Sequence, residues 1–420
     1  MSNNLSTALK PVVNSIRVLA MDGVQAANSG HPGLPMGMAD VAALLWSKYL
    51  KFDPKSPEWP DRDRFVLSGG HGSMLLYSLL HLSGYDLPLA ELKNFRQWGS
   101  HTPGHPEYGD TVGVEVTTGP LGQGISNAVG FALAERWLAA KFNKPGFDLV
   151  DHHTFVFAGD GDMMEGVSHE SCSLAGHLGL GKLILFYDDN GISIDGSTKI
   201  AFTEDVLARF AAYGWGTWRA DGHDPEAVQA ALLEALADEE RPSIIACKTV
   251  IGYGSPNKAG TASAHGEPLG AAEIALTKEA LGLPLEPFWV DPAAYEILGA
   301  AAEAGAGKRA AWADLLGSYT ESYPELGAEF TRTMQGDLPE GWDDFSVEYS
   351  KPIATRAASG MALNAAALRV PELLGGSADL TGSNKTDLKG AADVQKENGY
   401  NGRYLRFGVR EHGMGAIMNG

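Results

Sequence analysis

Residues 154–191 read TFVFAGDGDMMEGVSHESCSLAGHLGLGKLILFYDDNG, and this stretch decides the fold. Two short apolar runs, Thr154 to Phe157 and Leu183 to Tyr187, flank a helical pattern from His169 to Leu178. A continuous apolar run bounded by turn residues is typical of a strand that is covered on both faces of a sheet. The order strand, helix, strand therefore predicts two neighbouring parallel strands joined by a helix.

The same alternation continues on both sides of this stretch. Helical patterns cover Ile125 to Phe142 and Pro225 to Asp238, and a third apolar run covers Ser243 to Cys247. We therefore predict an α/β domain built on a doubly wound parallel sheet with helices on both faces. Ligands of such sheets bind beyond the carboxyl ends of the strands, so the residues that directly follow the strands are the first functional candidates.

The composition changes after this region. Residues 301–319, AAEAGAGKRAAWADLLGSY, and the charged stretch up to Tyr349 are typical of a connector with helical pieces. Globular patterning resumes near Lys351, with a helical pattern from Thr355 to Leu368 and then LLGGSADLTGSN. We predict a first domain over residues 1–295, a connector over 296–350 and the start of a second α/β domain over 351–420. Because the last residues, EHGMGAIMNG, are themselves a helical pattern, we expect this second domain to be truncated.

Charge and cysteine content restrict the function. The 420 residues include 32 basic and 52 acidic side chains, a formal net charge of −20. Nucleic-acid backbones are bound by clustered lysine and arginine, so this balance argues against a nucleic-acid partner. Phosphorylated small molecules stay possible substrates, because local groups hold them. The two cysteines, Cys172 and Cys247, provide neither a disulfide framework nor a cysteine metal cluster.

The first 25 residues have no pattern of a targeting segment. They place apolar residues at helical spacing after a polar start, without the basic region and apolar core of a signal peptide. The sequence also lacks a run of about 18 apolar residues, the length that a membrane span needs. We expect no membrane association and a cytoplasmic location.

Polar residues follow both strands of the opening stretch. Asp160 comes after the first strand within Gly-Asp-Gly, and Asn190 and Ile192 come after the second within DDNGI. Each motif alone is better explained by a tight turn. At adjacent strand ends, however, they would present a carboxylate, an amide oxygen and the backbone carbonyl of Ile192 to one point. Such oxygen ligands suit Mg²⁺ or Ca²⁺ rather than zinc, and the single carboxylate leaves the ion able to share a diphosphate.

A glycine cluster and several histidines add to this pattern. Residues 119–124, GPLGQG, precede a helix whose free N–H groups could face a phosphate, although glycines also permit close packing. Four of the twelve histidines lie in Gly/Pro/Ser loops: His31, His71, His105 and His265. Together they predict a pocket that handles hydroxyl and carbonyl protons near neutral pH. Their spacing does not match a zinc motif. We expect structural roles for His152, His153, His177 and His223.

These motifs together resemble transketolase over the whole 420 residues. The matching segments are SGHPGLPMGMAD, DRDRFVLSGGHGSMLLYSLL, TPGHPE, TTGPLGQG, GDGDMMEGVSHE, FYDDNGISIDG, GYGSPNKAGT, HGEPLG, GGSADL and FGVREHGM. GDG followed about thirty residues later by Asn is the general signature of enzymes that use thiamine diphosphate, and the histidine loops with SPNKAGT narrow the resemblance to transketolases. The sequence departs from the family pattern at Gly69, where relatives often carry asparagine, and at Ala262 and Ala264.

The resemblance implies a cofactor and a metal. Asp160, Asn190 and the carbonyl of Ile192 would hold Mg²⁺, or Ca²⁺ or another divalent cation, against the cofactor diphosphate. The residues that would line thiamine diphosphate are His71, Gly119, Pro120, Leu121, Gly161, Glu165, Asn190 and His265. Glu165 would also belong to a proton network that links the two sites of a dimer.

The resemblance also implies substrate and catalytic residues. His31, His105 and His265 would contact the sugar hydroxyls and carbonyl as part of the catalytic set, and Arg356 and Ser383 would bind the substrate phosphate. Glu411 would touch the aminopyrimidine ring of a cofactor that is bound mainly by the other subunit. The implied assembly is a homodimer with active sites at the subunit interface.

The expected activity is the transfer of a two-carbon ketol group between phosphorylated sugars. The donor would be a ketose phosphate such as xylulose 5-phosphate, and the acceptor an aldose phosphate such as ribose 5-phosphate or erythrose 4-phosphate. Dihydroxyacetone synthase, which accepts formaldehyde, shares the loops and stays an alternative, whereas phosphoketolase fits the histidine loops less well. A third alternative is a non-catalytic cofactor-binding part that needs a missing C-terminal portion.

Overall fold

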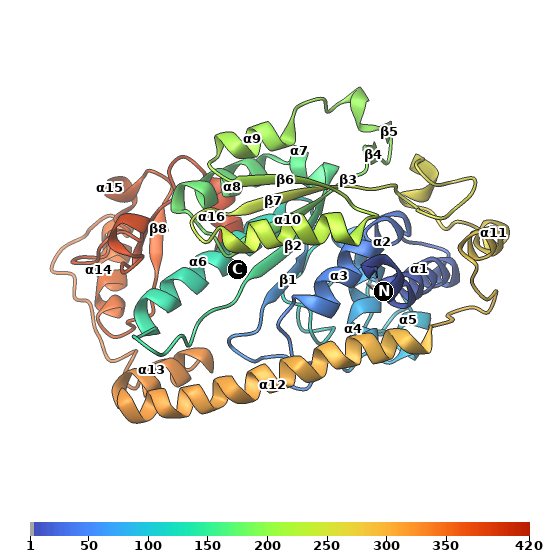
Figure 1. Cartoon of the computed structure of the whole chain (residues 1–420). Helices are drawn as coiled ribbons and strands as arrows, with labels where there is room; N and C mark the ends of the chain where they lie inside the picture. Colours follow the sequence, from blue (N-terminus) through green and yellow to red (C-terminus); the bar gives the residue numbers. More distant parts are fainter. Residues whose placement is uncertain (1–3) are drawn as a thin grey trace.

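The computed structural model describes residues 4–420. A parallel β-sheet runs through the middle of the molecule (Figure 1). The three predicted strands are confirmed as neighbours β2, β3 and β7, and β1 and β6 extend the sheet at its two edges. All adjacent strands are parallel. In spatial order the strands are β1 (Arg64–Leu67), β2 (Thr154–Gly159), β3 (Leu183–Asp189), β7 (Ser243–Lys248) and β6 (Gly216–Asp221).

The apolar runs of the central strands are explained by two separate cores. Phe155 and Phe157 of β2 belong to one core, and Val156 and Ala158 of the same strand belong to the other. Successive side chains of a strand point to opposite faces, so a strand covered on both faces must be apolar throughout. The first core is completed by α1 (Leu5–Ala27), α3 (Ala39–Lys48), α4 (Ser73–Leu82) and α10 (Pro225–Ala237), and the second by α6 (Gln123–Phe142) and α8 (Gly166–Leu178).

The predicted helices are confirmed with small changes at their ends. Asp224 accepts hydrogen bonds from the backbone N–H groups of Glu226 and Ala227, and Pro225 occupies the first helical position of α10. Both features stabilise a helix start. The shorter elements of the first domain are α2 (Gly33–Gly37), α5 (Leu89–Lys93), α7 (Asp160–Met164), β4 (Ile192–Ser193), β5 (Gly196–Ser197), α9 (Val206–Ala212) and α11 (Ala271–Leu281).

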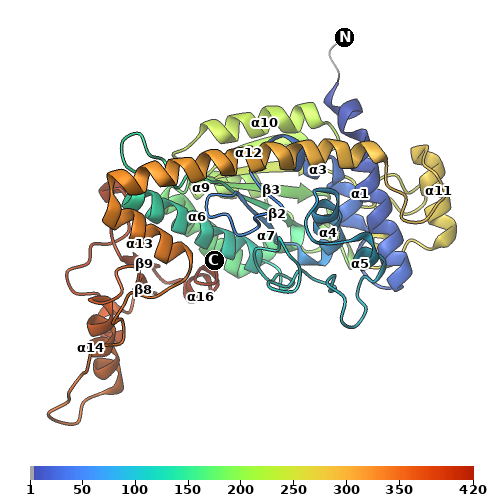
Figure 2. The ribbon, with the colours of Figure 1, turned by 90° about the horizontal axis from the view of Figure 1, so that it is seen from below.

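The helical pieces expected in the connector are confirmed as two helices, the first of which is long. Helix α12 (Pro292–Ser322) packs along α1, α3 and α4 (Figure 2) and is followed by α13 (Pro324–Met334). A Cβ atom at Gly305 would lie 1.7 Å from the carbonyl oxygen of Phe52, so this glycine permits close packing and does not break the helix. Helix α12 begins before residue 296, where the connector was predicted to start. The predicted domain limits stay a prediction.

Most of the C-terminal segment, residues 351–420, lies at the opposite end of the molecule from α1 and α11 (Figure 1). The helix expected from Thr355 is confirmed as α14 (Thr355–Ala367), and the final helical pattern is confirmed as α16 (Glu411–Ile417), which packs against α6 and α8. Between them lie β8 (Gly375–Ser377), α15 (Thr381–Asn384) and β9 (Tyr404–Arg406), and β8 pairs with β9 in parallel.

The helices of residues 4–420 include none with the length and apolar character that a bilayer crossing requires. Both cysteines are buried and free.

His152, just before β2, makes stability depend on pH. Its side chain is 4 % exposed, its Nδ1 atom lies 3.3 Å from Oδ1 of Asp61, and burial lowers its pKa to about 3. In the unfolded chain His152 binds a proton near pH 6.5, whereas in the folded chain it stays neutral at that pH. The contribution of His152 to the free energy of unfolding is therefore complete above pH 6.5 and decreases as the pH falls. We expect a loss of about 1 kcal/mol per pH unit below that point.

Urea unfolding between pH 5 and 7.5 tests this expectation. The His152→Gln variant should be less stable than the wild-type chain at pH 7.5, but its free energy of unfolding should fall less steeply with acidification. Parallel pH profiles for the two proteins would contradict the assignment.

Candidate active site

The cavity that collects most of the predicted site residues lies beyond the carboxyl ends of β1, β2 and β3. It has a volume of about 490 Å³. Its walls come from loops far apart in the sequence, which the sheet topology brings to one edge. The predicted residues that line it are His31, His71, His105, Gly119, Leu121, Asp160, Gly161, Asn190, Ile192 and His265.

The three predicted metal ligands are held together by hydrogen bonds. The backbone N–H of Gly191 donates to Oδ2 of Asp160 over 2.9 Å, and the N–H of Ile192 donates to Oδ1 of Asn190 over 2.9 Å. The turn after β3 is thus folded against the aspartate that follows β2. The hydroxyl of Tyr187 donates to Oδ1 of Asp160 and thereby helps to orient the carboxylate.

A further buried carboxylate orients the asparagine. Nδ2 of Asn190 donates to Oδ2 of Asp188 over 2.8 Å, and the hydroxyl of Thr249 donates to the other oxygen of Asp188. Asp188 is 1 % exposed, and burial raises its pKa to about 6. The amide nitrogen is thus occupied, and Oδ1 of Asn190, which accepts the Ile192 N–H, keeps its second lone pair for a ligand. Asp188 is not among the predicted site residues, although its position near the end of β3 was a signal.

The donor set fits a hard divalent cation. Within residues 4–420 there is no group of three His, Cys, Asp or Glu side chains that could hold a metal. The predicted site differs from such groups because it combines one carboxylate with an amide oxygen and a backbone carbonyl, which are ligands of Mg²⁺ and Ca²⁺. Burial raises the pKa of Asp160, while hydrogen bonds from Tyr187 and Gly191 lower it. A nearby cation would favour the ionised form further.

Glycines bring backbone to the wall of this cavity. A Cβ atom at Gly161 would lie 2.7 Å from Cδ1 of Leu121, so a side chain at residue 161 would displace the Leu121 side chain that lies against the end of β2. Gly119 has a φ of +155°, and a Cβ atom there would lie 3.3 Å from the His105 ring. The loop leads into α6, whose first N–H groups are the type that binds anions.

Three of the loop histidines form a cluster in this cavity. The ring centroids of His31 and His71 are 5.0 Å apart, those of His31 and His265 are 5.6 Å apart, and those of His71 and His265 are 5.1 Å apart. Burial lowers the pKa of His31 to about 4 and that of His71 to about 3, with a second contribution from His265 in both cases. It also lowers the pKa values of His105 and His265.

The histidines are therefore neutral at physiological pH. Among the described residues, Nδ1 of His31 and Nδ1 of His265 are buried without a hydrogen-bond partner. Unpartnered buried polar atoms are costly and are commonly satisfied by a ligand or water. The cluster can thus exchange hydrogen bonds with hydroxyl or carbonyl groups without adding charge.

A second cavity, of about 720 Å³, lies on the other side of the glycine loop. Pro120, Glu165 and Glu411 line it, so the structure separates these three predicted residues from the histidine cluster. Both Glu165 and Glu411 are exposed in the single chain. Glu170, which the sequence analysis missed, lies here too, and its carboxylate accepts the N–H of Gly413 over 2.6 Å. This bond joins α8 to α16.

Arg356 and Ser383 do not reach either of these two cavities. Arg356 lies in the first turn of α14 and Ser383 in α15, and both are exposed. They belong to the C-terminal segment, which packs at the far end of the first domain (Figure 1). Their predicted phosphate-binding role is therefore not assembled within one chain and stays a prediction.

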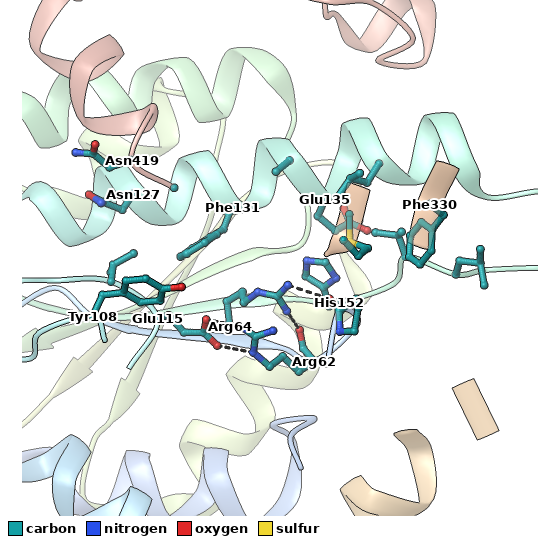
Figure 3. A pocket seen from close by; sticks show the side chains of 18 of the residues that line it. Arg62, Arg64, Tyr108, Glu115, Asn127, Phe131, Glu135, His152, Phe330 and Asn419 are labelled. Atoms are coloured by element: carbon teal, nitrogen blue, oxygen red, sulfur yellow. Dashed lines mark hydrogen bonds and ion pairs between the residues drawn. The ribbon is translucent and has the colours of Figure 1, made fainter. Parts of the chain in front are cut away.

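A cavity of about 620 Å³ lies between α6, α13 and the residues before β1 and β2, and it contains none of the predicted site residues (Figure 3). In this cavity Arg62 donates two hydrogen bonds, of 2.9 and 2.7 Å, to the carboxylate of Glu115. Asn419 and Gly420 form part of its wall. The residues predicted from the sequence thus line the cavity at the strand ends and not this one.

Comparisons with known protein families cover both parts of the chain. The family described as transketolase, thiamine diphosphate binding domain, matches residues 8–339, and the transketolase pyrimidine binding domain matches residues 351–420. The chain belongs to the transketolase family. Its first matched domain contains the cavity with Asp160 and the histidine cluster, and its second contains Arg356, Ser383 and Glu411.

Individual transketolases are similar over nearly the whole chain. Transketolase 1 of Escherichia coli is 57 % identical over 419 residues, which cover 98 % of this chain and 63 % of that protein. The transketolase of Pichia stipitis, solved in complex with sedoheptulose-7-phosphate, has a TM-score of 0.95 at 49 % identity, and the transketolase of Leishmania mexicana has 0.96 at 48 %. Both matches cover 98 % of this chain and 62 % of the solved chain. The chain thus spans a little over three fifths of these transketolases.

Proposed function

We propose that this chain carries the cofactor-binding part of an enzyme that transfers a two-carbon ketol group from a ketose phosphate to an aldose phosphate. The observation that supports this most is the single cavity in which Asp160, Asn190 and Ile192 adjoin a cluster of neutral histidines. The similar enzyme of Pichia stipitis was solved with a ketose phosphate. Xylulose 5-phosphate as donor and ribose 5-phosphate or erythrose 4-phosphate as acceptor are the expected substrates.

The cofactor would be thiamine diphosphate held through Mg²⁺. When bound, thiamine diphosphate supplies the electron sink for cleavage and formation of a carbon–carbon bond. Asp160, Asn190 and the carbonyl of Ile192 would bind the cation, which offsets the charge of the diphosphate. Gly119 and Gly161 would let backbone approach the cofactor. Ca²⁺ or another divalent cation could bind through the same oxygen atoms.

The histidines would position the sugar and move its protons. Because burial lowers the pKa values of His31, His105 and His265, each ring is neutral and can accept a proton from a hydroxyl group or donate a hydrogen bond to a carbonyl. His71 is the most deeply enclosed of the cluster and would pack against the cofactor. Neutral rings also avoid repulsion between three neighbouring cations.

A second copy of the chain would complete the site. Glu411, Arg356 and Ser383 lie outside the cavity that holds Asp160 and are exposed in the single chain. This placement supports a homodimer in which each chain supplies these residues to the cofactor of the other. A cytoplasmic location stays a prediction as well.

Product analysis tests the proposed reaction. The protein that contains this chain is incubated with Mg²⁺, thiamine diphosphate, xylulose 5-phosphate and ribose 5-phosphate, and we expect a seven-carbon ketose phosphate to form. Preference for formaldehyde as acceptor would favour a dihydroxyacetone synthase. Cofactor binding without turnover of either acceptor would favour a non-catalytic part. Failure to bind the cofactor would contradict the proposal.

A further inference from the structure

Asp162 is a buried carboxylate whose hydrogen-bond donors come from three different segments. It is the third residue of α7 and is 0 % exposed. Its Oδ1 accepts from the hydroxyl of Ser68 over 2.6 Å and from the backbone N–H of Gly122 over 2.8 Å. Its Oδ2 accepts from the N–H of Gly159 over 3.0 Å. One side chain thus joins the end of β1, the glycine loop and the end of β2.

Ser68 extends this connection to a helix. Its hydroxyl oxygen accepts the backbone N–H of Ile125 over 3.1 Å, at the start of α6, while its proton is donated to Asp162. Each of the three joined segments carries predicted cofactor or metal residues. They are the loop with His71, the loop with Gly119 and Leu121, and the turn with Asp160.

The loop after β1 is also held by the backbone N–H of Ser68, which donates to the carbonyl oxygen of Phe157 over 2.8 Å. Gly69 has no side chain, and a Cβ atom there would lie 3.6 Å from Oδ2 of Asp162 and 3.2 Å from Leu34. Among the described residues, no basic side chain forms an ion pair with Asp162. Burying a carboxylate without a cation is costly unless hydrogen bonds offset the loss of hydration, and here three donors offset part of that cost.

We propose that Asp162 is a positioning residue that sets the relative placement of the three loops around the cofactor. It would act through Ser68, Gly122 and Gly159, and its effect on cofactor affinity rests on the proposed function. Its chemical requirement is specific, because both carboxyl oxygens accept: Oδ1 from Ser68 and Gly122, and Oδ2 from Gly159. An amide in its place would turn an N–H group toward one of these donors.

Hydrogen–deuterium exchange of the ligand-free chain tests the positioning directly. In Asp162→Asn, amide exchange should rise at least threefold in residues 66–74, 119–126 and 157–164 together. The matched control is Asp63→Asn, because Asp63 is also buried and accepts backbone N–H groups from Lys51 and His153 at the other end of the sheet. The control should leave the three segments unchanged. Unchanged exchange in Asp162→Asn would overturn the proposal.

Cofactor titration provides the second readout. Calorimetry with thiamine diphosphate at saturating Mg²⁺ should show a Kd at least tenfold higher for Asp162→Asn and a wild-type Kd for Asp63→Asn. The milder variant Ser68→Ala should give an intermediate Kd and faster exchange in residues 119–126. If Asp162→Asn lowers Tm but keeps the wild-type Kd, the residue is only structural and the inference is wrong. If the wild-type chain itself does not bind, the proposed function fails, and the exchange experiment still decides the role of Asp162.

Discussion

Replacement of Asp160 by alanine is expected to raise the Kd for thiamine diphosphate in the presence of Mg²⁺ by at least about 100-fold. Loss of residues that only support metal ligands costs about 10- to 100-fold in affinity, so loss of the single carboxylate ligand should cost at least as much. The remaining donors, Asn190 and Ile192, carry no charge and cannot offset the cation. Isothermal titration calorimetry with and without Mg²⁺ measures the effect.

The control for this prediction is Asp189→Asn. Asp189 is also an aspartate at the end of a neighbouring strand, but it does not line the cavity and instead pairs with Lys248 at 3.4 Å. The Asp189→Asn variant should bind the cofactor with the wild-type Kd. A second variant, Asp160→Asn, removes the charge but keeps the shape of the side chain and an oxygen that accepts the Gly191 N–H. The Kd of this variant for the cofactor should still lose most of its dependence on Mg²⁺. Wild-type affinity in either Asp160 variant would refute the metal assignment.

Glu411→Gln is expected to lower kcat by about 100-fold or more while the protein stays folded. A positioned proton-transfer group contributes about 10²- to 10⁴-fold to a rate, and the amide cannot exchange the proton. Glu411 is exposed in the single chain and begins α16, so its replacement should cost little stability. The measurement is twofold: steady-state turnover of the complete enzyme, and the rate at which the C2 hydrogen of bound thiamine diphosphate exchanges with deuterium, followed by NMR.

Glu397→Gln is the matched control, because Glu397 is another exposed glutamate of the C-terminal segment and lines neither cavity. It should keep both rates. If Glu411→Gln exchanged the C2 hydrogen at the wild-type rate, Glu411 would have no role in activating the cofactor. A slower exchange with unchanged cofactor Kd would support proton transfer rather than binding.

The parts of the fold that could be predicted are those whose residues are buried on every side. β2, β3 and β7 are covered on both faces, so they are continuous apolar runs in the sequence. β6 was missed because it is an edge strand, GTWRAD, that keeps Arg219 exposed and so lacks such a run. Glycine usually weakens a helix, but within α12 Gly305 is required by its close contact with Phe52, which only the structure shows.

The candidate site divides in a similar way. Asp160 and Asn190 could be predicted from strand ends alone, because parallel neighbouring strands end at one edge of a sheet. Asp162, Asp188 and Glu170 could not, since a carboxylate buried by distant segments has the same local sequence as an exposed one. The resemblance to transketolases named Arg356 and Ser383, but the structure places them away from the histidine cluster.

By itself, the sequence determined the parallel α/β sheet, the two strand-end motifs and the family, because these depend on residue types at short spacing. Only the tertiary structure decided that His31, His71 and His265 face one another, that their buried rings are neutral, and that Asp162 joins three loops. Such features depend on contacts between segments that are far apart along the chain. Their energies come from desolvation and hydrogen bonding in the folded state, which no local pattern records.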